Sequence, residues 1–155
     1  MSKREIIIFF ITVLVIYLLY FNDTRISWEA YNGKTYKIRN DGNDLNQIKA
    51  DFLAKIDEKA RKIVQYMYDN KLPSDAISKK TYNRFKNCTI GETPNGDKSA
   101  AYTINKGNGG IFLCCLTNGK LKSENDSFFV ILHELAHVMS DSYGHGNEFK
   151  TNFDF

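Results

Sequence analysis

The chain has three histidines, and they lie close together in its C-terminal part, at His133, His137 and His145. If residues 126–140 form a helix, positions four apart lie one turn apart on the same face, so His133 and His137 can reach one cation. Glu134 then points into the same space. A catalytic zinc is held by three protein ligands and keeps a fourth position open for water. The pattern therefore predicts a zinc site that needs one more ligand.

His145 is the favoured third ligand, because histidine is the commonest metal ligand and the chain has no other to offer. Gly144 can adopt a positive φ that ends the helix and reverses the chain, which would bring His145 back toward the helix. Asp141 and Glu148 stay open as alternatives, since a carboxylate can also complete such a site. Glu134 is assigned to proton transfer as the catalytic base.

The residues around the motif favour a helix that is buried on most sides. Asn125 or Asp126 can serve as its N-cap. An almost continuous apolar surface follows from Phe128, Phe129, Ile131, Leu132, Leu135, Ala136 and Met139. The alternative is a chance pattern on an ordinary core helix. That alternative leaves polar groups buried without partners, at a cost on the order of a few kcal/mol each.

Residues 133–149, with Asn152 and Phe153 after them, resemble the WLM and SprT-like zinc metallopeptidases, in particular those of large DNA viruses. Residues 102–107 and 111–114 are similar to the same group. The resemblance implies an α+β, zincin-like fold in which a small antiparallel sheet packs beside the active-site helix. It also implies zinc ligands and a catalytic residue at His133, His137, His145 and Glu134. Members of this group cleave proteins, including proteins crosslinked to DNA, but the motif alone does not carry that substrate over. The family's closing helix is expected to be longer than residues 148–155.

The N-terminus carries Lys3 and Arg4 and then an uncharged apolar run over residues 6–21. This run is just below the length of roughly 20 residues that a spanning helix needs. A signal-peptide cleavage site with small residues is missing, which favours an uncleaved anchor. The basic residues predict a cytoplasmic N-terminus. We therefore expect residues 1–25 to form a cytoplasmic stub and a single-pass transmembrane signal anchor; a buried core helix is the alternative.

Residues 26–155 are expected to form one metallopeptidase domain. The expected elements are a short hairpin or extended lead-in over 28–39, a long helix that is capped by Asn43 or Asp44 and runs through Asn70, a short helix over 79–85, and strands at Ile90, 101–104 and 111–116, with a flexible turn over 105–110. The last of these strands is expected to present an open edge to an extended peptide.

The formal net charge of the chain is only +3, and basic residues are not concentrated in any stretch. Charge therefore does not support nucleic acid as a partner. Cys88, Cys114 and Cys115 lack the paired spacing of a zinc ribbon or a redox motif. We expect them to be small buried apolar residues, although Cys88 could pair with Cys114 or Cys115 in an oxidising compartment.

Together these features predict a membrane-anchored zinc endopeptidase that hydrolyses peptide bonds of a protein or peptide substrate with an activated water. Tyr143 is expected either to donate a hydrogen bond to the oxyanion or to pack. Two alternatives stay open: a non-catalytic, zinc-stabilised membrane interaction module, and a zinc amidase acting on small or cell-wall peptides.

Overall fold

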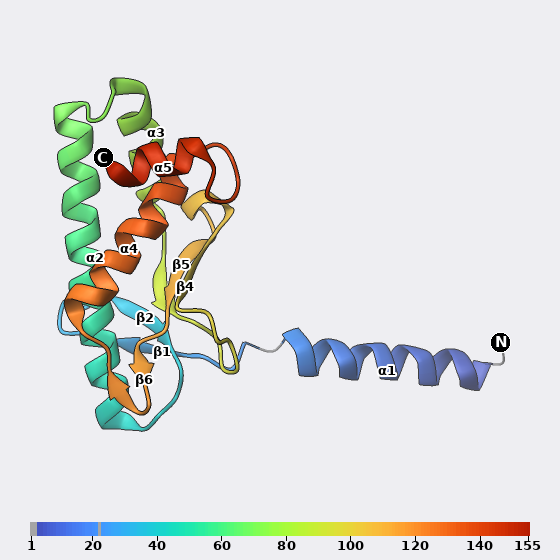
Figure 1. Ribbon diagram of the computed structural model, residues 1–155. Coiled ribbons are helices and arrows are strands. Elements are labelled where there is room, and N and C mark those ends of the chain that lie inside the picture. Colours follow the sequence, from blue (N-terminus) through green and yellow to red (C-terminus); the bar gives the residue numbers. More distant parts are fainter. Residues whose placement is uncertain (1–2, 22) are drawn as a thin grey trace.

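A computed structural model of the chain describes residues 3–21 and 23–155, including all of their side chains except those of residues 18–21. It is an α+β protein with small sheets (Figure 1). The elements in chain order are α1 (Lys3–Phe21), β1 (Ile26–Glu29), β2 (Thr35–Ile38), α2 (Asn43–Asn70), α3 (Asp75–Phe85), β3 (Ile90–Glu92), β4 (Ala101–Ile104), the 3-10 turn η1 (Asn105–Gly107), β5 (Gly110–Leu113), β6 (Leu116–Thr117), β7 (Lys120–Leu121), α4 (Glu124–Met139) and α5 (Asn147–Asp154).

Helix α1 extends away from the rest of the molecule (Figure 1). Among the described residues, no helix is long and apolar enough to cross a membrane. The uncharged run of residues 6–21 measures about 24 Å as a helix, whereas a bilayer core is roughly 30 Å thick. The predicted transmembrane anchor, and with it the single-pass membrane localisation with a cytoplasmic N-terminus, is therefore wrong. The alternative of a buried core helix is also wrong, because the side chains of residues 3–17 are exposed.

The long helix α2 follows its predicted apolar spacing and ends at Asn70 as expected, but it begins at Asn43, so the expected N-cap at Asn43 or Asp44 is wrong. Gly42 occupies the N-cap position, without a side-chain hydrogen bond. At the other end Lys71 adopts a left-handed conformation, and its N–H closes the last turn. The buried face of α2 includes Phe52, Leu53 and Ile56, which belong to the main hydrophobic core. Helix α3 is longer than expected, because the Ser74 side chain caps it and the helix begins at Asp75, four residues before position 79.

The main sheet has the strand order β3-β5-β4. Strand β4 is antiparallel to β5, whereas β3 is parallel to it. The expectation of an antiparallel sheet is therefore wrong for β3. The chain reverses direction between β3 and β4 and again between β4 and β5, so β5 runs in the same direction as β3. The expected strand over 111–116 is also interrupted, since β5 ends at Leu113 and β6 starts at Leu116. Strand β5 is paired on both sides, so the edge strands of this sheet are β3 and β4, and β4 is the one that packs against α4.

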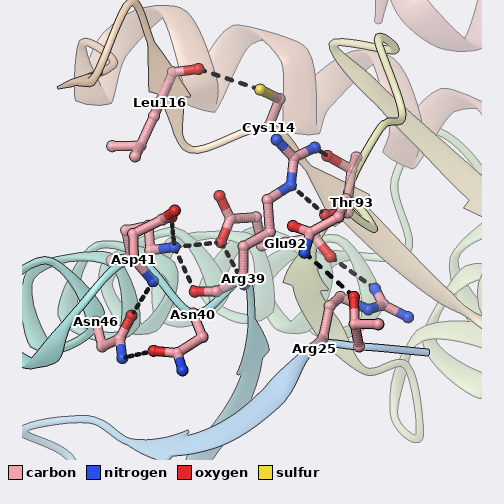
Figure 2. A network of polar contacts seen from close by, with 12 residues as sticks. Arg25, Arg39, Asn40, Asp41, Asn46, Glu92, Thr93, Cys114 and Leu116 are labelled. Atoms are coloured by element: carbon pink, nitrogen blue, oxygen red, sulfur yellow. Dashed lines mark hydrogen bonds and ion pairs between the residues drawn. The ribbon is translucent and has the colours of Figure 1, made fainter. Parts of the chain in front are cut away.

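The expected hairpin is confirmed as the antiparallel pair β1–β2. A buried polar network fixes this hairpin to the sheet and to α2 (Figure 2). The Glu92 side chain, at the end of β3, accepts a hydrogen bond from the Arg39 backbone N–H at 2.8 Å and pairs with Lys49 of α2 at 2.8 Å. The side chains of Lys49 and Glu92 are both fully buried. Such a pair orients its elements strongly, because removing one partner leaves an uncompensated buried charge.

The three cysteines are free, and Cys88 and Cys115 are buried. Burial raises the pKa of the Cys88 thiol to about 12 and also raises the pKa of Cys115. The expectation of small buried apolar residues is confirmed for these two, while Cys114 is only partly buried. Burial thus disfavours the thiolate at Cys88 and Cys115, and the thiolate is the reactive form of cysteine.

Candidate metal centre

Helix α4 presents two histidines on one face. It packs against α2, α3 and β4, and its buried face carries Ile131, Leu135 and Val138. His133 and His137 are half-buried beside that face, with ring centroids 5.2 Å apart. Ser123 caps the helix by accepting a hydrogen bond from the backbone N–H three residues on. The expected cap at Asn125 or Asp126 is therefore wrong.

The loop after α4 returns the third histidine to this face. The helix ends at Met139, and the N–H and hydroxyl of the C-cap residue Ser140 both donate to the carbonyl of Ala136. Gly144 has the expected positive φ of 77°, but it lies in the middle of the loop and does not end the helix. The ring of His145 lies 4.9 Å from that of His133 and 4.8 Å from that of His137, centroid to centroid.

These three histidines can hold a metal ion. Their ligand nitrogens all lie within 4.8 Å of one another, and the Nε2 atoms of His133 and His145 are 2.9 Å apart. Two nitrogens on a tetrahedral zinc lie roughly 3.3 Å apart, given Zn–N bonds of about 2.0–2.1 Å. The observed separations bracket that value. Small rotations of the rings would therefore suffice for coordination.

Both carboxylates that sequence reasoning left open as ligands have other partners. The two oxygens of Glu148 accept hydrogen bonds from the backbone N–H groups of Asp141 and Ser142 at 2.8 and 2.9 Å. These bonds, the one from Asp141 first, lower the pKa of Glu148 to about 2. The Asp141 carboxylate pairs with Lys80 and Arg84 of α3. Glu148 thus holds the loop that carries the third histidine.

Two further side chains hold the same loop from elements distant in sequence. Arg84 donates hydrogen bonds to the carbonyls of Val138 and Ser140 at 2.8 and 3.0 Å. Lys106 donates to the Ser142 carbonyl, and its Nζ lies 4.4 Å from the centroid of the Tyr143 ring. Tyr143 is 84% exposed and stacks under this ammonium group, so its described contact is with Lys106.

Phe149 is a site residue that sequence reasoning missed. Its ring centroid lies 4.4, 4.6 and 4.8 Å from those of His137, His145 and His133, respectively. Phe149 is buried and stacks in turn on Phe153, one turn further along α5. It therefore forms an apolar backing for all three imidazoles. The i, i+4 spacing of two phenylalanines in the last segment is the signal that could have identified it.

Glu134 lies on the same pocket without belonging to the group of possible metal ligands. Its side chain is only 5% exposed, and one carboxylate oxygen accepts a hydrogen bond from Thr103 Oγ1 at 2.6 Å. The pocket has a volume of about 330 Å³ and is lined by the three histidines, by Glu134 and by strand β4. Thr103 was also missed by sequence reasoning, because it lies 31 positions away and belongs to another element.

The electrostatics of the site keep His137 in the form that binds metals. Burial, followed by the charges of His133 and His145, lowers the pKa of the His137 imidazole to about 4. The folded-state pKa is below the ordinary value of 6.5, so the ring is neutral from weakly acidic pH upward. A neutral imidazole has the lone pair that a metal needs.

No protein-family model, curated protein or solved structure matches this chain. Function therefore has to be inferred from the geometry of the site.

Proposed function

We propose that this protein is a zinc-dependent endopeptidase of the WLM/SprT-like kind, which hydrolyses peptide bonds in a protein or peptide substrate. One observation carries the proposal: His133, His137 and His145 converge on a pocket that also contains the buried carboxylate of Glu134. Three imidazoles and an adjacent carboxylate are the parts that a hydrolytic metal site needs.

The donor set favours zinc in a catalytic site. Imidazole nitrogens suit zinc, and structural zinc sites are usually closed by four protein ligands, often thiolates. Here the group of possible ligands among the described residues has three members, all histidines. Zinc bound by three side chains lowers the pKa of a water molecule and polarises a carbonyl group.

Glu134 is the proton carrier in this proposal. It accepts the proton of the attacking water and returns it to the amine that leaves when the peptide bond breaks. Its carboxylate lies beside the ligands, and the hydrogen bond from Thr103 occupies one of its two oxygens. The other oxygen can then serve the water.

The edge strand β4 favours an extended peptide as substrate. The backbone N–H of Cys114 donates to the carbonyl of Ala100, and pairs with and without hydrogen bonds alternate along an antiparallel ladder. The backbone groups of Ala101 and Thr103 consequently point away from β5, toward the open edge. A peptide can add to such an edge through main-chain hydrogen bonds.

A second pocket beside the start of β4 fits a substrate side chain. It has a volume of about 370 Å³, and Ala100, Cys114 and Val130 contribute to its wall. Val130 lies one turn before His133 on α4, so this pocket adjoins the metal site. Strand addition supplies affinity, and pockets of this kind supply specificity.

The test is cleavage of an unfolded protein by the purified chain, with and without a chelator, for the parent and for Glu134→Gln. The glutamine variant should bind zinc as the parent does and lose at least about two orders of magnitude in rate, because general acid–base catalysis contributes ~10²–10⁴-fold. His133→Ala is the companion variant and should lose zinc. Equal cleavage by parent and Glu134→Gln would refute the mechanism, and zinc binding without any cleavage would favour a non-catalytic zinc module.

A further inference from the structure

Among the described residues, the Glu134 carboxylate accepts one hydrogen bond, from the hydroxyl of Thr103, with 2.6 Å between Oγ1 and Oε2. We propose that Thr103 is a positioning residue, which holds Glu134 in the one orientation that serves proton transfer. This inference rests on the proposed peptidase function. Thr103 lies outside the histidine motif, on strand β4, and would act through Glu134.

The contact is short and its acceptor is removed from water. Glu134 is 5% exposed, and a hydroxyl that donates to a carboxylate forms a stronger hydrogen bond than a neutral pair. A glutamate side chain has three rotatable bonds, and its terminal torsion is broad. Without a partner the carboxylate would sample several orientations in the pocket. The hydroxyl removes that freedom.

Thr103 is well placed to act as a fixed reference. It belongs to β4, where it pairs with Ile111 of the central strand β5, and Ile111 is fully buried. Its β-branched side chain is restricted in χ1. The hydroxyl is therefore held by a strand, while the carboxylate it contacts is held by α4. Proton transfer depends on such placement, since a misplacement of about 1 Å can cost roughly 10²-fold in rate.

The same residue connects the base to the substrate. The backbone groups of Thr103 point to the open edge of β4, whereas its side chain reaches Glu134 on α4. A peptide paired with this edge is thus held at a fixed offset from the catalytic carboxylate. Binding and chemistry share one residue, and only the chemistry uses its hydroxyl.

The decisive variants are Thr103→Val, which keeps the branched shape and removes the hydroxyl, and Thr103→Ser, which keeps the hydroxyl. Thr103→Val should lower kcat by about ten- to a hundredfold with KM and zinc content close to those of the parent. Thr103→Ser should restore most of kcat. Thr35→Val, at an exposed position of strand β2, is the matched control and should leave all three quantities unchanged. A Thr103→Val enzyme with the kcat of the parent would overturn the proposal.

A second readout needs neither metal nor turnover. Loss of the hydroxyl should lower the folding equilibrium constant of the metal-free protein by about tenfold when Glu134 is present, and by clearly less in a Glu134→Ala background. If loss of the Thr103 hydroxyl lowers the folding equilibrium constant equally with Glu134 and with Glu134→Ala, the hydroxyl makes no stabilising contact with the Glu134 carboxylate. If the parent cleaves no peptide while this coupling is found, the peptidase proposal fails and the contact between Thr103 and Glu134 stands.

Discussion

Replacing Glu148 by glutamine tests whether the loop after α4 is held ready for the metal. The carboxylate accepts two backbone N–H groups, from Asp141 and Ser142. Glutamine has a single acceptor oxygen and no charge, so one of these bonds and the charge assistance of the other are lost. Hydrogen bonds to charged groups contribute about 1.5–3 kcal/mol. Because Glu148 lies near the surface and is screened by solvent, we expect a loss of about 1 kcal/mol in the free energy of unfolding.

The consequence for the metal should be larger than the consequence for folding. His145 follows this loop, and groups that orient metal ligands typically change affinity by about 10–100-fold. We expect Glu148→Gln to bind zinc about tenfold more weakly in competition with a chromophoric chelator. Asp154→Asn removes an exposed carboxylate from the same helix, away from the loop, and should bind zinc like the parent.

The pH dependence follows from the lowered pKa of Glu148. Its folded-state pKa is about 2 and its ordinary value is 4.5. The stabilisation by this carboxylate is therefore fully present above about pH 4.5 and is lost as the pH falls toward 2. The difference in stability between parent and Glu148→Gln should disappear over that interval when metal-free proteins are compared by denaturant unfolding.

If Glu148→Gln binds zinc with the affinity of the parent, Arg84 and Lys106 alone hold the loop. That result would refute this reasoning.

Two further predictions concern the fold. Lys49→Met should destabilise the protein by about 3–5 kcal/mol in urea denaturation, because it leaves the buried Glu92 carboxylate without its cation. The double variant with Glu92→Met should recover part of this loss. An unchanged urea midpoint for the single variant would contradict the role of the pair. Gly110→Ala should lower the thermal midpoint, since Gly110 has φ 106° and an added Cβ would lie 2.6 Å from Thr89 Oγ1, at a cost of about 1–3 kcal/mol. Gly119 also has a positive φ, but a Cβ added there would meet open space. If Gly119→Ala lowers the thermal midpoint more than Gly110→Ala does, the steric explanation is wrong.

The sequence by itself determined the features that depend on helical periodicity. The spacing of four between His133 and His137 places them one turn apart, whatever packs around the helix. The same reasoning located α2 from its apolar stripe, because the spacing of a buried face is a property of the chain segment. The convergence of His145 was also anticipated, since it needs only a short loop and a glycine that tolerates positive φ.

Contacts between elements were decided by the tertiary structure alone. Strand order made β4 an edge strand and placed β5 in the centre, although both segments are equally predicted as strands from the sequence. Thr103 meets Glu134 because β4 packs against α4, and Phe149 meets the histidines because α5 folds back over them. Glu148 looked like a ligand from its position, and its backbone partners made it a support for the loop. Periodicity assigns a side chain to a face, but packing decides what that face meets.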